Sequence, residues 1–283
     1  MILLETLKLL RPHQWVKNAF ILAPLFFTPA AMTVGNVEKV WLGVLCFSAL
    51  ASAIYILNDT MDRASDRQHP TKCKRPLAAG TVPLPLALVV MAVLATGGLL
   101  LAYALTPGFL ILSLIYLGVN LGYSLGLKKI SILDVMLVSL GYVLRVFGGA
   151  ELIGVRASEW IIVCTGLVSL FIALAKRRDD IVKDLGKDHR KALAGYNLPF
   201  LDTAIAMMLA GLLVSYLLYT VEAGIHNLYL TTPFVIMGVL RYLQIALVEH
   251  RSGSPTTIVL TDKFLIGNVL AWITTFGALI YGR

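Results

Sequence analysis

Three carboxylates stand directly after an uncharged stretch of the sequence, at Asp59, Asp62 and Asp66. If a helix runs through them, positions i, i+3 and i+7 lie within about 60° of one face. Acids that share a face repel one another unless a cation lies between them. Mg²⁺ prefers such oxygen ligands and commonly binds together with phosphates. The spacing therefore predicts that these three residues bind a metal and carry catalysis, with an ordinary solvated charged loop as the alternative.

A second charged segment begins at Lys176, and in it Asp180, Asp184 and Asp188 follow one another at intervals of four. This spacing spreads the acids over about 80° of a helix face. Together with the cations around them, they could flank a metal-bound diphosphate. A basic juxtamembrane helix that meets lipid head groups is the alternative. Which acids of this segment act stays open, because Asp179 offers another alignment.

Basic and polar residues around both segments are candidates for binding the phosphate oxygens that a metal leaves uncovered. Arg145 is the one basic residue deep inside a predicted span, and it either binds an anionic substrate or makes a structural contact, with Asp134 or at a helix cap. The other candidates are Gln14, Lys17 and Asn18 in the N-terminal RPHQWVKN, Arg67, Lys72 and Arg75 after the first acids, Lys176 and Arg177 before the second, and Tyr123 with Lys128 at the end of another predicted span.

The elements that must position these residues are membrane helices. Of the 283 residues, 58% are hydrophobic and only 14% are charged, which is typical of a membrane protein. Uncharged runs long enough to cross a hydrocarbon core of ~30 Å recur without the alternation of a β-barrel, so the predicted fold is all-α. We expect one membrane domain over residues 1–283, with an amphipathic N-terminal helix in place of a signal peptide. The predicted spans are 18–35, 40–57, 84–105, 108–127, 131–150, 159–176, 202–222, 228–248 and 263–281.

The distribution of positive charge predicts the orientation of these nine spans. Of the 24 Lys and Arg residues, all but Lys39, Arg145, Arg156 and Arg283 fall on the side of the N-terminus. Because cytoplasmic loops are enriched in Lys and Arg, the N-terminus and both acidic segments are expected in the cytoplasm. The formal net charge of +8 favours anionic partners, lipid head groups or phosphorylated substrates, and no nucleic-acid-binding module is recognisable.

Residues Asn58 to Asp66 match the pattern NDxxDxxxD, and on this motif the chain resembles the UbiA superfamily of intramembrane prenyltransferases. The resemblance implies a helical bundle around a central cavity, capped on the cytoplasmic side, with Mg²⁺ at two acidic motifs. It also implies that Asp59, Asp62 and Asp66 carry the metal and that Asn58 lines the site. The expected location is a bacterial plasma membrane, crossed several times, with the active site on the cytoplasmic side.

Within this superfamily the chain is most similar to the decaprenyl-phosphate phosphoribosyltransferase branch. Residues 11–18, 66–80, 133–150, 173–180 and 189–197 carry this similarity. It implies Mg²⁺-dependent transfer of 5-phosphoribose from 5-phosphoribosyl-1-diphosphate to a polyprenyl phosphate, with Mn²⁺ as a possible substitute for Mg²⁺. The bilayer is the expected surrounding, and a homo-oligomer stays open.

Two alternatives remain. The nearer one is an aromatic prenyltransferase that joins a polyprenyl diphosphate to a hydroxybenzoate or a quinone precursor. It needs the same metal-bound diphosphate, but the additional cations favour a donor with a third phosphate. The other alternative is a transporter or channel for an anionic metabolite, which the lack of inverted repeats or broken-helix pairs in the sequence disfavours.

Overall fold

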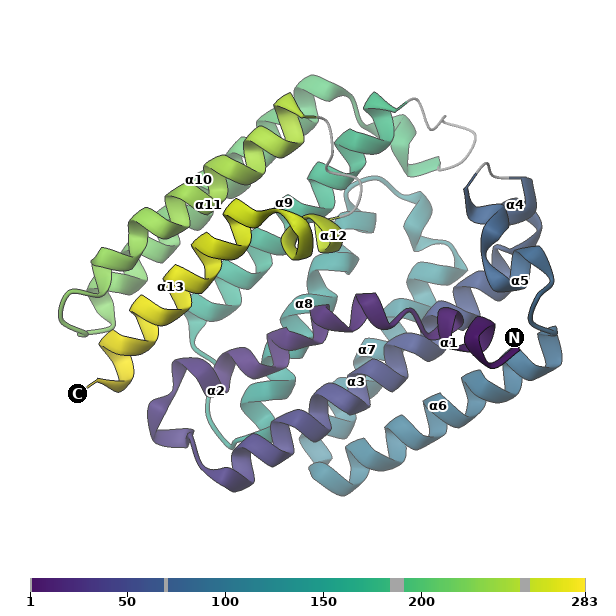
Figure 1. Ribbon diagram of the computed structural model, residues 1–283, viewed down its shortest axis with the longest axis horizontal. Helices are drawn as coiled ribbons and strands as arrows, with labels where there is room; N and C mark the ends of the chain where they lie inside the picture. Colours follow the sequence, from purple (N-terminus) through teal and green to yellow (C-terminus); the bar gives the residue numbers. More distant parts are fainter. Residues whose placement is uncertain (1, 69–70, 184–190, 250–254, 283) are drawn as a thin grey trace. The chain divides into compact units, whose positions relative to one another are not determined.

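The computed structural model describes residues 2–68, 71–183, 191–249 and 255–282, and all regular elements in these ranges are helices (Figure 1). The elements are α1 Ile2–Leu10, η1 Pro12–Leu22, α2 Ala23–Phe27, η2 Pro29–Ala31, α3 Val34–Met61, α4 Arg63–Gln68, η3 Lys72–Lys74, α5 Pro76–Ala79, α6 Leu84–Leu105, α7 Pro107–Leu125, η4 Leu127–Lys129, α8 Leu133–Leu152, α9 Glu159–Val182, η5 Lys191–Gly195, α10 Leu198–Glu222, η6 Leu228–Thr231, α11 Thr232–Leu243, η7 Gln244–Val248, α12 Pro255–Thr261 and α13 Lys263–Tyr281.

Among the described residues, 8 helices are long and apolar enough to cross a membrane. They are α3, α6, α7, α8, α9, α10, the run from Leu228 to Val248, and α13, and they correspond to eight of the nine predicted spans. The all-α membrane fold is therefore confirmed, but the count of nine is not.

The predicted first span, 18–35, is a succession of short pieces: the 3-10 helix η1, the five-residue helix α2 and the turn η2. Prolines explain the interruption, because Pro24 lies at the start of α2 and Pro29 at the start of η2. Each lacks the backbone N–H that a continuing helix needs. The segment is nevertheless packed, since Asn18, Ile21, Pro24 and Leu25 are buried.

The described chain divides into two compact units. Unit 1 comprises residues 1–127 and 144–157, and unit 2 comprises residues 128–143 and 158–283, so that α8 contributes to both. The expectation of a single domain over 1–283 stays a prediction.

Unit 1 is built on α3, which packs along α6 and η1. Phe47 of α3 lies at the centre of its core, with ring centroids 5.5 Å from Phe109 and 5.0 Å from Tyr116. Glycines permit the close packing: a Cβ on Gly98 would collide with Leu50 of α3, and one on Gly149 would overlap a backbone carbonyl of η1.

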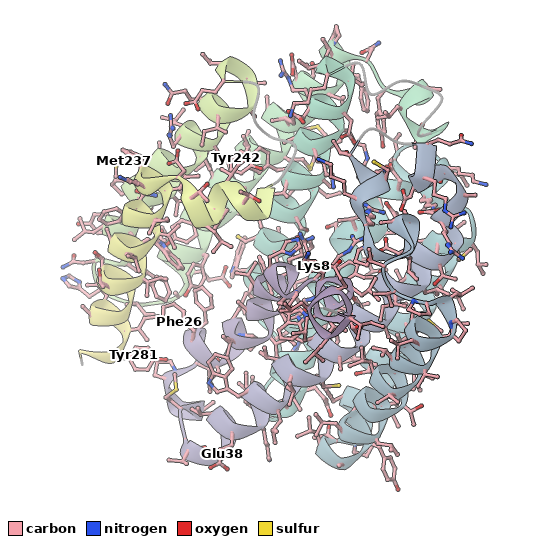
Figure 2. All side chains as sticks on the ribbon, turned by 45° about the vertical axis from the view of Figure 1, so that its right-hand side comes forward. Lys8, Phe26, Glu38, Met237, Tyr242 and Tyr281 are labelled. Atoms are coloured by element: carbon pink, nitrogen blue, oxygen red, sulfur yellow. The ribbon has the colours of Figure 1, made fainter. Side chains whose placement is uncertain are left out.

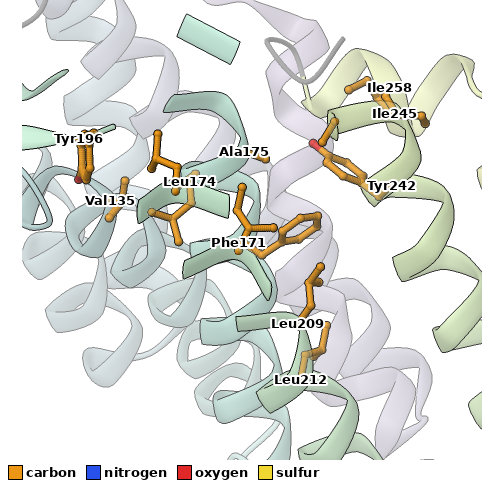
Figure 3. Packing of buried hydrophobic residues seen from close by; sticks show 14 of the residues in the cluster. Val135, Phe171, Leu174, Ala175, Tyr196, Leu209, Leu212, Tyr242, Ile245 and Ile258 are labelled. Carbon is orange, nitrogen blue, oxygen red and sulfur yellow. The ribbon is translucent and has the colours of Figure 1, made fainter. Parts of the chain in front are cut away.

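Unit 2 is built on α9 and α10, which lie side by side (Figure 1). Its core includes Phe171, Leu174, Leu209 and Tyr242, and the rings of Phe171 and Tyr242 meet edge to face at 4.8 Å (Figure 3). α11 packs against α13, and Figure 2 marks Met237 and Tyr242 on the first of these helices.

Candidate active site

The first acidic motif lies where α3 ends. Asp59 belongs to its last turn, Asp62 caps its C-terminus, and Asp66 lies on α4 directly afterwards. The backbone stays nearly helical across the junction, since Asp62 N–H donates to Asn58 O and Asp66 N–H donates to Asp62 O, each at 2.8 Å. Asp59 and Asp66 are only 2% and 3% exposed, whereas Asp62 is partly exposed. Two of the three predicted acids are thus buried carboxylates.

Arg75 bridges these two buried carboxylates. Its Nη1 lies 3.0 Å from Asp59 Oδ1 and 2.7 Å from Asp66 Oδ2. Arg11 adds a second cation, because its Nη2 donates to Asp59 Oδ1 at 2.5 Å. Burying negative charge is expensive unless it is paired and hydrogen-bonded, and the two guanidinium groups supply that pairing. Two acids and two arginines therefore form one charge-compensated cluster in unit 1.

The donor set of this cluster fits a magnesium ion. Asp59 and Asp66 each place a carboxylate oxygen within hydrogen-bond distance of the same atom, Arg75 Nη1, so one cation can contact both. Mg²⁺ is commonly bound by one or two carboxylates, with water and substrate phosphate oxygens completing its octahedron. Within the described part of the chain no three His, Cys, Asp or Glu side chains gather closely enough to bind a metal without such additional ligands.

The N-terminal segment is bound to one face of α3 by polar side chains. The contacts are Arg11 with Asp59 and, at 5.1 Å, the ring of Tyr55; Trp15 Nε1 with Ser52 Oγ at 3.1 Å; and Asn18 Nδ2 with Ser48 Oγ at 2.8 Å. The four α3 residues recur every three or four positions, which places them on one helix face. These contacts place Arg11 beside the acids. The RPHQWVKN motif therefore contributes Arg11 to the site, and Arg11 was not among the predicted site residues.

Arg145 is buried in unit 1, at 5% exposure. Its Nε donates to Asn18 Oδ1 at 2.8 Å, its Nη2 donates to the Tyr116 hydroxyl at 3.2 Å, and its guanidinium lies 4.9 Å from the Tyr116 ring centroid. A pair with Asp134 was one open structural alternative, and it is wrong: the two lie ~16 Å apart along α8. Arg145 thus holds η1 in place through Asn18.

The further predicted residues of unit 1 differ in their contacts and in their exposure. Asn58 Oδ1 accepts a hydrogen bond from Ser124 Oγ at 2.5 Å, next to Tyr123 in the last turn of α7. Arg67 Nε donates to Ala78 O at 3.2 Å, and its side chain is exposed. Gln14, Lys17 and Lys72 are each partly exposed.

The second charged segment occupies the end of α9 in unit 2. Arg177 Nε binds Asp134 Oδ2 at 2.7 Å, and Arg177 Nη1 lies 3.5 Å from Asp180 Oδ2. Asp179 is buried and its Oδ2 pairs with Lys183 at 2.8 Å. Its Oδ1 has no hydrogen-bond partner within the described residues.

The other predicted residues of this region differ in their exposure. Lys176 is exposed, whereas Asp180 and Lys128 are partly buried. Asp184 and Asp188 lie outside the described residues. The buried acceptor of Arg177, Asp134, lies 43 residues away in the sequence, and no pattern pointed to that pairing.

The fold and the site define a class of protein: a multi-pass membrane protein with a buried acidic cluster, suited to a metal, at the end of a transmembrane helix. The chain belongs to the UbiA prenyltransferase family, whose model matches residues 20–280. It is 34% identical to a decaprenyl-phosphate phosphoribosyltransferase of Mycobacterium tuberculosis, over 96% of this chain and 93% of that protein. It is 33% identical to the protein of the same name from Mycolicibacterium smegmatis, over 97% of this chain and 92% of that one.

Solved structures show the same fold. A UbiA homolog from Archaeoglobus fulgidus, bound to DMAPP and Mg²⁺, superposes with a TM-score of 0.75 at 21% identity, covering 98% of this chain and 99% of the other. The family membership and the all-helical membrane fold expected from the sequence are therefore confirmed.

Proposed function

We propose that this protein is a transferase that moves 5-phosphoribose from 5-phosphoribosyl-1-diphosphate to a polyprenyl phosphate and releases diphosphate. The observation that carries the proposal is the 34% identity to a decaprenyl-phosphate phosphoribosyltransferase over nearly the full length of both chains. The buried cluster of Asp59, Asp66, Arg11 and Arg75 supports it, because it combines oxygen ligands for a metal with cations for phosphate.

The residues of the cluster have distinct roles in this proposal. Asp59 and Asp66, with Asp62 beside them, hold Mg²⁺, or Mn²⁺ in its place. When bound, this ion neutralises charge on the departing diphosphate. Arg75 and Arg11 contact oxygens of the same diphosphate, and their planar forks suit bidentate binding. The 5-phosphate, which a prenyl diphosphate lacks, is bound in this proposal by the further cations of unit 1, Lys17, Arg67 and Lys72.

The acceptor needs no general base in this scheme. A polyprenyl phosphate is already anionic at neutral pH, so its oxygen attacks the anomeric carbon as the bond to the diphosphate breaks. Positioning and electrostatic stabilisation then supply most of the rate. Gln14, Asn58 and Tyr123 complete the polar lining, and Asp180 with Asp184 forms the second acidic motif. The site faces the cytoplasm, as the distribution of Lys and Arg favours.

The direct test incubates the purified protein with 5-phosphoribosyl-1-diphosphate, Mg²⁺ and polyprenyl phosphates of several lengths, followed by mass analysis of the lipid. The proposal predicts a lipid heavier by one phosphoribosyl group, formed only with divalent metal and absent with Asp59→Asn. Lys74→Gln is the matched control, because Lys74 is exposed in the same segment. Product from a prenyl diphosphate and a hydroxybenzoate, with none from the ribosyl donor, would establish the aromatic prenyltransferase instead.

A further inference from the structure

A buried hydrogen-bonded group joins three segments of unit 2. Asp134 lies at the start of α8, Arg177 near the end of α9, and Tyr196 just after η5. Arg177 Nε donates to Asp134 Oδ2 and the Tyr196 hydroxyl donates to Asp134 Oδ1, both at 2.7 Å. Asp134 is 0% exposed and Arg177 is 3% exposed. Each oxygen of one fully buried carboxylate therefore receives a donor from a different segment.

The Tyr196 hydroxyl also fixes a strained backbone. It accepts a hydrogen bond from the N–H of Ile132 at 2.6 Å, and Ile132 has a φ of 69°. β-branched residues avoid this left-handed region, and such outliers persist where the surrounding structure holds them. Beside it, Ser131 Oγ donates to Ala192 O at 2.7 Å. The connection before α8 is thus tied at two points to the segment that follows the second acidic stretch.

Arg177 passes this constraint to a candidate site residue. Its guanidinium is planar, so a bond from Nε to Asp134 decides where the two Nη atoms lie. One of them, Nη1, lies 3.5 Å from Asp180 Oδ2. A buried ion pair is weak evidence for a purely stabilising role, because apolar residues of similar volume in its place often give a protein of equal or higher stability. The arrangement is better explained by the position that it gives to Asp180.

We propose that Asp134 and Tyr196 are positioning residues for the transfer reaction: together they hold Arg177, which sets Asp180 to contact a Mg²⁺-bound diphosphate. The inference rests on the proposed function for the identity of the whole substrate. It concerns only the diphosphate end, so it can be tested without turnover.

The test measures binding of inorganic pyrophosphate with Mg²⁺ to the intact, detergent-solubilised protein by calorimetry. The variants are Tyr196→Phe, Asp180→Asn and the double variant, with Tyr229→Phe as the matched control, since Tyr229 is 57% exposed in the turn η6. Tyr196→Phe is expected to weaken binding about tenfold, and Tyr229→Phe to leave it unchanged. Because Tyr196 acts through Asp180, the double variant should bind no more weakly than Asp180→Asn alone.

Ser131→Ala tests the same link with a smaller change, in case Tyr196→Phe folds poorly. It should weaken pyrophosphate binding by about threefold, and this loss should also vanish in the Asp180→Asn background. Losses that multiply in the double variants, or normal binding by Tyr196→Phe, would overturn the inference. Failure of the proposed function would give a different result, because the wild type would then transfer no phosphoribose. The pyrophosphate affinities of the wild type, the two single variants and the double variant would still decide the role of Tyr196.

Discussion

Arg75 neutralises the two buried carboxylates Asp59 and Asp66, and this leads to a prediction about stability. Arg75→Gln removes both contacts of Nη1, at 3.0 Å to Asp59 and 2.7 Å to Asp66. Hydrogen bonds to charged groups contribute about 1.5–3 kcal/mol each. The Arg75 side chain is 30% exposed, so solvent screening lowers the total. A loss of about 2–3 kcal/mol is expected, since Arg11 still pairs with Asp59.

The assay is thermal unfolding of the solubilised protein with EDTA and with increasing Mg²⁺. In EDTA, Arg75→Gln should unfold at a clearly lower temperature than the wild type. Mg²⁺ binds only the folded site, so it should restore more stability to the variant than it adds to the wild type. Lys74→Gln, an exposed change of equal charge in the same segment, controls for net charge. Equal unfolding temperatures for Arg75→Gln and the wild type in EDTA would refute the view that Arg75 neutralises the two acids.

Three further predictions concern catalysis, packing and orientation. Asp59→Asn and Asp66→Asn should each reduce transfer at least a hundredfold, and the double variant should lose little more, because the ligands act as a unit; normal turnover of either variant would remove that residue from the metal site. Gly149→Ala should lower the yield of folded protein, because the new Cβ would overlap a carbonyl of η1. Gly97→Ala is the control and should leave the yield unchanged, because no described residue lies within 4 Å of a Cβ at that position. Equal yields of the two variants would contradict the packing argument. A cysteine at Ser65 should react with impermeant thiol reagents only after the membrane is opened, and labelling in intact cells would reverse the assigned orientation.

The sequence predicted the position of the first acidic motif, because it depends on local features. An uncharged helix-length run ends at Asn58, and the acids follow within two helical turns. The same hydropathy signal located the eight long apolar helices. It failed at 18–35, since mean hydropathy does not register that Pro24 and Pro29 interrupt helical hydrogen bonding.

The cation partners could not be predicted, because they are set by tertiary contacts. Arg11 reaches Asp59 across 48 residues of sequence, and Arg177 reaches Asp134 across 43. Arg75 and Arg177 were predicted from the sequence as phosphate ligands, and the sequence carried no sign that both would also bind carboxylates. A single sequence records charge and spacing along the chain, and it carries no direct sign of which charges meet in the fold.

In the proposed reaction, phosphoribose leaves its diphosphate and joins a lipid phosphate. The most direct test compares two parallel reactions, one with ³²P in the 5-phosphate of the donor and the other with ³²P in the terminal phosphorus of its diphosphate. With wild-type protein, Mg²⁺ and polyprenyl phosphate, the 5-phosphate label should move into the organic phase and the diphosphate label should stay in water as free diphosphate. A 5-phosphate label that remains in water in the presence of folded protein and acceptor would contradict the account.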